Sequence, residues 1–524
     1  MSRVEHRPAR GGRGRGDDGF ILATFGLFLV GMMTIAALAI DVGAWYSRGS
    51  QLQRAADAAA LAAVVWMPNL NGLGTNATDV AITTAAKNGF VNDGTASTVL
   101  VSAVPGNTRQ VKVTITDLHA PRYFSQFVIA NQTISKSATA EYVMPLPLGS
   151  PRNTFGSGDL LTAASGGAEN FWATVNGWCA GKESGDDRLA KWDQILGSTS
   201  LLCPTSFANP TYDSDGYFYT VDVAAAGTLN LWLFDPAYVE ASRPDLPIWP
   251  GSTITTTFKL WGPGPNAFEI PTGGPLLRST TYASGSTTYQ DQWANFYSAA
   301  AAPGRYFLQV YTAQNEANSF GINAFGIEAI MGGSSTIPPG NGTVGSGVNA
   351  CTTIVGGTGY SATCPKVAGI DAISIFGNLQ NGTTASFYLT SVDPVYAGKT
   401  MDLQLFDPGE GALTMQVLDP NDLPVQFTWD TPCTSPPAAA TGGCSGGPTS
   451  VLDVSGNGTQ PVPGEYNGYK FNNRMVNVHI TLPSSFVAYN GKTWWRIAYT
   501  FNAAPNDRTT WSASISGNPV HLIQ

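Results

Sequence analysis

Residues 20–66 read FILATFGLFLVGMMTIAALAIDVGAWYSRGSQLQRAADAAALAAVVW, and this stretch decides how the chain is organised. Its first part, residues 20–40, has no charge and no proline. At 1.5 Å per helical residue it reaches about 31 Å, the thickness of a bilayer's hydrocarbon core. From Asp41 onward the apolar residues recur at intervals of three and four, the spacing of one helical face. We therefore predict one long helix, half in a membrane and half outside it.

A set of residues just after the apolar span carries a family resemblance. The set comprises Asp41, Gly43, Leu52, Gln53, Ala55, Ala56, Asp57, Ala58, Ala59, Ala60, Leu61 and Ala62. Behind a basic head and an apolar span, this order resembles the N-terminal segment of the TadG-like proteins of the tight-adherence (Flp) pilus machinery. The resemblance covers about residues 18–66 and extends more weakly to 148. It implies a non-enzymatic, pilin-related protein that is tethered to the membrane and has other pilin-like or secretion-platform proteins as partners.

The basic head predicts the orientation of the chain. Residues 1–18 hold five arginines and almost nothing apolar, so we expect a disordered segment that stays in the cytoplasm. A transmembrane helix at 19–41 then places the C-terminal bulk outside the bacterial cytoplasmic membrane. The whole chain has a formal net charge of −9, which argues against nucleic acid as a partner.

Three interpretations of the apolar span stay open at this point. The span is a retained anchor, a secretory signal cleaved after Ala39, or a pilin-type leader cleaved after Gly19. A secretory signal usually has a shorter apolar region, which favours the retained anchor. The resemblance implies Glu at the fifth position of a processed pilin, whereas this chain has Thr24 there.

Residues 42–148 predict a pilin-like α+β unit. After the long helix we expect a second helix over 77–88 and half-buried strands over 98–104 and 110–116, where apolar and polar residues alternate. A short helix over 121–129 and a last strand over 133–143 complete the unit.

The rest of the chain contains an internal duplication. LWLFDP at 231–236 recurs as LQLFDP at 403–408, and the segments on either side match in the same order. Short alternating strands with Gly and Pro turns predict β-sandwiches. We therefore expect sandwich domains at 149–331 and 350–524, joined by a Gly-rich linker at 332–349. The predicted fold class is a membrane-anchored α+β pilin-like unit followed by two tandem all-β sandwich-like domains.

All six cysteines lie on the predicted outer side of the membrane, where disulfides persist. Pairing between nearest neighbours is the simplest arrangement. The predicted pairs are Cys179–Cys203, Cys351–Cys364 and Cys433–Cys444.

The sequence offers little support for catalysis. It has no GxSxG, HExxH or P-loop motif, and its four histidines are scattered. We therefore expect no enzyme, no catalytic residue and no metal site. Calcium is the one cofactor that the loop carboxylates could bind, although Asp before Pro also closes ordinary turns. An alternative function is a surface module that binds carbohydrate or protein and has no role in a pilus.

Overall fold

The computed structural model describes most of the chain. The described residues are 17–67, 69–72, 75–105, 107–127, 131–156, 170–193, 203, 208–240, 245–264, 270–271, 273–332, 364–378, 384–409, 411–431, 445–455, 471, 473–489, 492–501, 506–517 and 520–523. The predicted linker therefore lies outside them, apart from Gly332, and so does the predicted head, apart from Asp17 and Asp18. The fold consists of two compact units, residues 1–142 with 519–524, and residues 143–518.

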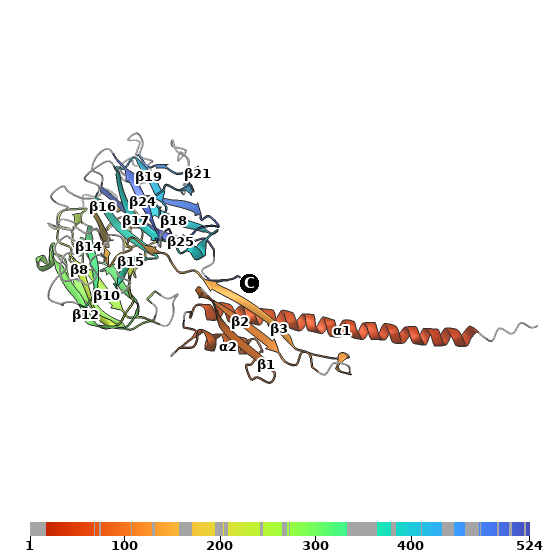
Figure 1. The fold of residues 1–524 in the computed structure, drawn as a ribbon. Helices are drawn as coiled ribbons and strands as arrows, with labels where there is room; N and C mark the ends of the chain where they lie inside the picture. The colour runs from red at the N-terminus through yellow and green to blue at the C-terminus, as the bar shows by residue number, and fades with distance from the viewer. Residues whose placement is uncertain are drawn as a thin grey trace, which may run out of the picture. The chain divides into compact units, whose positions relative to one another are not determined.

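The first unit is an α+β fold built on one long helix (Figure 1). Its elements are α1 (Asp17–Val64), α2 (Ala77–Lys87), β1 (Ser97–Val104), β2 (Asn107–Asp117), the 3-10 turn η1 (Ser125–Phe127), β3 (Ile134–Tyr142) and β26 (Val520–Leu522). The strands form an antiparallel sheet in the order β1-β2-β3-β26. The predicted second helix and the predicted strands are present, with ends shifted by up to three residues. In the described part of the predicted short helix, residues 121–127, only the three residues of η1 have helical geometry.

Helix α1 is continuous across the predicted membrane boundary. Its first half exposes large apolar side chains from Phe20 to Ile40, whereas its second half buries Leu52 and most of the following alanines. Small side chains in that half allow the helix to pack closely on the sheet and on α2. The helix is long and apolar enough to span a bilayer. It begins at Asp17, two residues before the predicted span.

The C-terminal strand corrects the predicted domain order. The residues of β26 were expected in the second sandwich, but they pair with β3 of the first unit. Val520 lies opposite Tyr142 and Leu522 lies opposite Ala140. The physical reason is that β3 would otherwise leave an unpaired sheet edge, and β26 supplies its partner. The β-rich unit is thus inserted between the third and fourth strands of the first unit.

Where the structure describes it, the second unit is all-β apart from short 3-10 turns, and its strands fall into two halves. The first half contains β4 (Pro147–Leu148), β5 (Thr154–Phe155), β6 (Asn170–Asn176), η3 (Lys182–Ser184), β7 (Tyr217–Val223), β8 (Gly227–Phe234), β9 (Leu246–Pro247), β10 (Thr256–Trp261), β11 (Leu276–Tyr282), η4 (Thr287–Tyr289), β12 (Trp293–Ala301), β13 (Gly304–Thr312) and β14 (Gly321–Met331). The second half contains β15 (Lys366–Ile370), β16 (Ala372–Asn378), β17 (Thr384–Ser391), η5 (Pro394–Tyr396), β18 (Thr400–Phe406), β19 (Thr414–Leu418), β20 (Phe427–Asp430), β21 (Ser445–Thr449), β22 (Leu452–Asp453), β23 (Met475–Thr481), β24 (Trp494–Thr500) and β25 (Asn506–Ile515).

The two halves have the same strand pairing, as the duplication predicts. In the first half β13 lies between β7 and β10, and β8 lies between β12 and β14. In the second half β24 lies between β17 and β19, and β18 lies between β23 and β25. The repeated motif ends β8 and β18, and its Asp235 and Asp407 both have a positive φ. Tandem sandwich-like β domains are therefore present.

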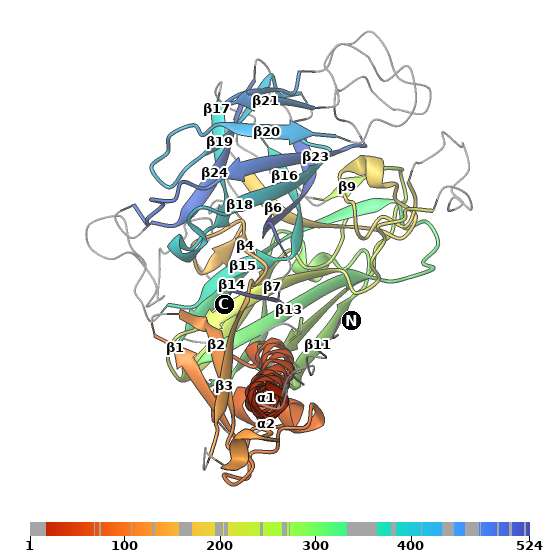
Figure 2. The ribbon, with the colours of Figure 1, turned by 90° about the vertical axis from the view of Figure 1, so that its right-hand side faces the viewer.

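The two halves do not, however, hang in series on a linker. They form one compact unit, and its main hydrophobic cluster contains buried residues of both halves. Strands β6 and β16 pair with each other, so they join the two halves in one sheet (Figure 2). The first strand of each half pairs with a strand of the other half. Strand β15 of the second half pairs with β7 of the first, and β4 of the first half pairs with β17 of the second. This exchange covers sheet edges that a separate sandwich would leave open.

Candidate functional site

The best-defined contact near the apolar span is between α1 and the loop before η1. Asp41 is 1% exposed, and its carboxylate accepts backbone N–H bonds from Tyr123 (2.7 Å), Phe124 (3.1 Å) and Ser125. One helical turn further on, the Trp45 indole N–H donates to the carbonyl of Pro121 (2.8 Å). We call this arrangement the helix–loop contact. A carboxylate that accepts several amide N–H bonds at the start of a 3-10 turn acts as an N-cap from another element.

Most of the other signature residues belong to the packing face of α1. Leu52, Ala55, Ala56, Ala59 and Ala60 are buried, whereas Gly43 is exposed and has open space around it. Asp57, Ala58, Leu61 and Ala62 are half-buried.

Gln53 connects the signature to the sheet. Its side-chain amide donates both to Asp57 of the same helix (2.8 Å) and to the Ser137 carbonyl of β3 (3.1 Å). The signature residues thus hold the unit together around α1.

Beside the helix–loop contact lies an open polar hollow of about 430 Å³. Its lining residues are Ala44, Ser47, Arg48, Gln51, Asp117, His119, Pro121 and Tyr123. Arg48 forms an ion pair with Asp117 (2.6 Å), and its guanidinium lies over the Phe90 ring. The hollow therefore follows the apolar span along α1 and is lined by charged and polar groups. The spacing of apolar residues could not reveal it, because half of its lining comes from the end of β2 and the loop that follows, which are far from α1 in the sequence.

In the second unit, His479 bridges two carboxylates across three strands. Its Nδ1 lies 2.7 Å from Asp402 on β18, and its Nε2 lies 2.8 Å from Asp430 on β20. The hydrogen bonds with Asp402 and then Asp430 raise the pKa of His479 above its usual 6.5. Bonds from Asn477 and His479 lower the pKa of Asp430. The alternating pattern of β23 predicts the half-exposed position of His479 but not its partners.

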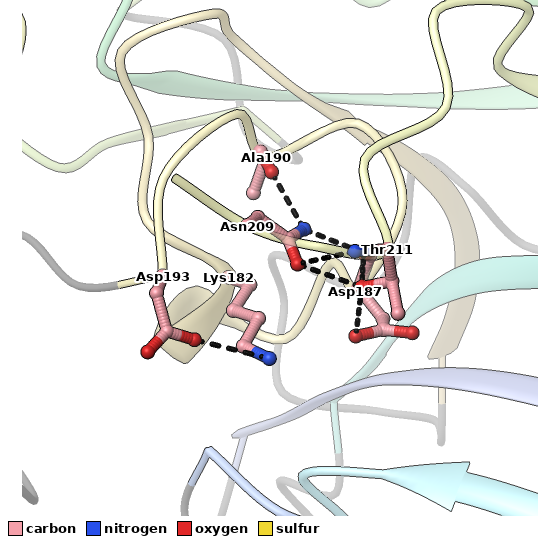
Figure 3. A network of polar contacts seen from close by, with 6 residues as sticks. All are labelled: Lys182, Asp187, Ala190, Asp193, Asn209 and Thr211. Carbon is pink, nitrogen blue, oxygen red and sulfur yellow. Dashed lines mark hydrogen bonds and ion pairs between the residues drawn. The ribbon is translucent and has the colours of Figure 1, made fainter. Parts of the chain in front are cut away.

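A buried polar network fixes the connection between β6 and β7 (Figure 3). The Asn209 amide donates to the carbonyls of Asp187 (2.7 Å) and Ala190 (2.8 Å), and the Asn209 Oδ1 accepts from Thr211. Lys182 and Asp193 form an ion pair at 3.0 Å in the same region. The bonds satisfy backbone groups of an irregular segment, so their role is structural.

The neighbouring carboxyl of Asp186 is also fully buried. It accepts from the Tyr217 hydroxyl (2.6 Å) and from the N–H groups of Asn176, Arg188 and Leu189. Burial raises the pKa of Asp186, although these donors favour the ionised form. Its donors come from three parts of the first half, which it holds together.

The structure describes part of the predicted disulfide set. Cys179 and Cys203 form a disulfide, as the first predicted pair requires. Cys364 is disulfide-bonded, and its predicted partner Cys351 lies outside the described residues. Cys433 and Cys444 both lie outside them, so the third pair stays a prediction.

The loop carboxylates that suggested calcium occupy turns. Asp213 accepts the N–H of Asp215 (2.9 Å), and Asp419 accepts the N–H groups of Asn421 and Leu423, as Asx turns do. Within the described ranges, no three His, Cys, Asp or Glu side chains are arranged to hold a metal ion. The expectation of no cofactor, with calcium as the one alternative, stays a prediction.

These observations define a class of protein: a long helix, apolar and exposed at its start, around which a small α+β unit is built. Residues 19–65 match the model of the Flp pilus-assembly TadE/G-like family, which confirms the predicted resemblance in that segment. An apolar helix within this domain fits a membrane anchor. The comparison with curated proteins finds no match.

The fold was also compared with solved structures. One similar structure is the N-terminal CBM22-1-CBM22-2 tandem domain of Xyn10C from Paenibacillus barcinonensis. The match has 10% sequence identity and a TM-score of 0.14, and it covers 56% of this chain and 80% of that one. A likeness at this level carries no argument about function.

Proposed function

We propose that this protein is a non-enzymatic component of an Flp/Tad pilus-assembly system. In this proposal it crosses the bacterial cytoplasmic membrane once, with its N-terminus in the cytoplasm and its β-rich unit outside. The observation that carries the proposal is the continuity of α1 from Asp17 to Val64. Because the helix does not break at the boundary, the apolar span fixes the position of the packed signature face, and through it the rest of the first unit. The TadE/G-like match over residues 19–65 supports the association with pilus assembly.

The membrane role is tested by deleting residues 20–40 in a host that assembles such a pilus. We expect the protein to leave the membrane fraction and attachment through the pilus to be lost. A matched control replaces the same residues with an unrelated apolar segment of equal length, and it should restore membrane fractionation. Attachment that persists after the deletion would refute the assembly role.

The orientation is tested separately, with a membrane-impermeant protease added to spheroplasts. The β-rich unit should be degraded while a tag on the N-terminal head survives. The opposite pattern would reverse the proposed topology. A disulfide between Cys179 and Cys203 supports an oxidising compartment for this unit.

A second function, carbohydrate or protein binding by the β-rich unit, is favoured by one surface. On the outer face of the β17–β24 pair, Tyr388 and Trp494 are half-buried and lie edge to face with 6.1 Å between ring centroids. The Arg496 guanidinium lies over the Tyr388 ring, and Arg496 pairs with Asp422 (3.1 Å). Aromatic faces beside charged groups suit sugar stacking. A glycan array probed with full-length protein should show hits that Trp494→Ala removes, and an array without hits would exclude carbohydrate binding by this surface.

A further inference from the structure

The helix–loop contact brings unexplained aromatic side chains to the end of the apolar span. Tyr123 is 57% exposed and Phe124 is 47% exposed, although both are large apolar residues. On α1, Tyr46 is 80% exposed and Val42 lies one turn before it. We call Tyr123 and Phe124 the aromatic patch. Large exposed side chains on adjacent residues, held at the end of an apolar span, mark a contact surface.

The position of the patch is fixed relative to the span. Asp41 follows the last span residue directly, and its carboxylate accepts the N–H groups of Tyr123, Phe124 and Ser125. Trp45 donates to Pro121 of the same loop. The loop therefore has contacts with α1 at two points separated by one helical turn. In Figure 1 the short orange segment between β2 and β3 lies along the exposed part of α1.

The side chains along α1 change in the order that a membrane interface requires. The apolar residues up to Ile40 come first, Trp45 and Tyr46 follow, and Arg48 with its ion-pair partner Asp117 comes last. From Ile40 to Tyr46 the helix rises about 9 Å, somewhat more than the roughly 5–7.5 Å of one headgroup layer, so Tyr46 lies at the outer edge of that layer when Ile40 ends the hydrocarbon core. Tyr and Trp side chains prefer this layer, because one end is apolar and the other is polar. The patch is thus continuous with the membrane-spanning surface.

We infer that the loop Pro121–Phe127 is a second membrane contact, in which Tyr123 and Phe124 insert into the lipid interface beside α1. The inference rests on the proposed membrane tether. The aromatic patch contacts the lipid surface, and not a second protein, because the patch borders the span directly and is bounded by polar groups on the other side. The contact would hold the α+β unit against the bilayer and stop α1 from rotating about its axis. The same face of the helix would then always be presented to a partner.

The test uses the full-length chain in vesicles of phosphatidylethanolamine and phosphatidylglycerol that carry a lipid-bound quencher. An environment-sensitive fluorophore is attached, without reducing agent, to a cysteine at an exposed position. Gln126→Cys places the label in the loop and leaves the aromatic patch intact, since Gln126 is exposed. Leu29→Cys reports on the span and Tyr489→Cys reports on an exposed site of the second unit.

We expect the label at 126 to be quenched from the lipid and protected from aqueous iodide. Tyr123→Ser with Phe124→Ser in the same labelled chain should reduce its quenching to the level at 489. If the label at 126 already behaves like the one at 489 while the label at 29 is quenched, the second contact is refuted and the tether stands. If the label at 29 is not quenched either, the tether itself is refuted. Quenching at 126 that survives the double substitution would exclude these two side chains as the contact.

Discussion

Replacing Asp41 by Ala tests whether its carboxylate holds the loop on α1. The substitution removes the acceptor of three backbone N–H groups, at 2.7 Å from Tyr123, 3.1 Å from Phe124 and a short distance from Ser125. A hydrogen bond to a charged group contributes about 1.5–3 kcal/mol. Because the loop is partly exposed, water replaces some of the lost bonds. We therefore expect local opening to become easier by about 2–4 kcal/mol, less than the sum of the three bonds.

Amide hydrogen exchange of the full-length protein in lipid nanodiscs measures this opening directly. A change of 2–4 kcal/mol corresponds to exchange that is about 30- to 1,000-fold faster at residues 123–125. Asp57→Ala is the matched control, because Asp57 lies on the same helix and accepts a bond from the Gln53 side chain. Its effect on residues 123–125 should stay within a few-fold. Unchanged exchange in Asp41→Ala would show that the loop is held by other contacts and would refute our account of the signature aspartate.

Four further changes test the rest of the structure. Asn209→Leu removes the network of Figure 3 and should lower the unfolding free energy of the β-rich unit by about 3–5 kcal/mol, as measured by chemical denaturation; a loss below about 1 kcal/mol would contradict the network. His479→Gln should lower the melting temperature at pH 6 but not at pH 9. Because the pKa of His479 is raised in the fold, its protonation stabilises the folded state fully below about pH 6.5, and this contribution is lost as the pH rises through the folded-state pKa. Equal melting temperatures of the variant and the wild type at pH 6 would exclude this contribution. Cys179→Ser opens a loop with a sequence separation of 24 and should lower the unfolding free energy by about 3.5 kcal/mol. If reduction of the wild-type protein causes no loss of stability, the disulfide is refuted. Removing residues 519–524 should speed amide exchange in β3 and leave the melting of the β-rich unit unchanged; unaltered exchange in β3 would show that β26 adds nothing to the sheet.

Local patterns predicted the first unit well. The apolar run and the spacing of three and four define α1, and the alternation in residues 110–116 defines β2 to within three residues. These signals are local, because burial of one face determines them. The same holds for the duplicated strands, since LWLFDP and LQLFDP occupy equivalent places in β8 and β18.

Long-range pairing could not be predicted from the same signals. The exchange of β4 and β15 between the halves depends on which free sheet edge each strand pairs with. The alternation of apolar and polar residues within a strand predicts which face is buried, but it does not predict the partner strand. Strand β26 has only three residues and no pattern of its own. Asp41 was singled out as a signature residue, but its role depends on amides 82 to 84 positions away.

The insertion of the β-rich unit between β3 and β26 has a mechanical consequence. The inserted unit leaves and re-enters the first unit through two chain crossings, one after Tyr142 and one before Val520. A protease cut before Val520 leaves the inserted unit covalently joined to α1 through the crossing after Tyr142, whereas a single cut after Tyr142 leaves it held only by the pairing of β26 with β3. A pull on the inserted unit is therefore borne by one covalent crossing, and the three residues of β26 add a second, non-covalent hold.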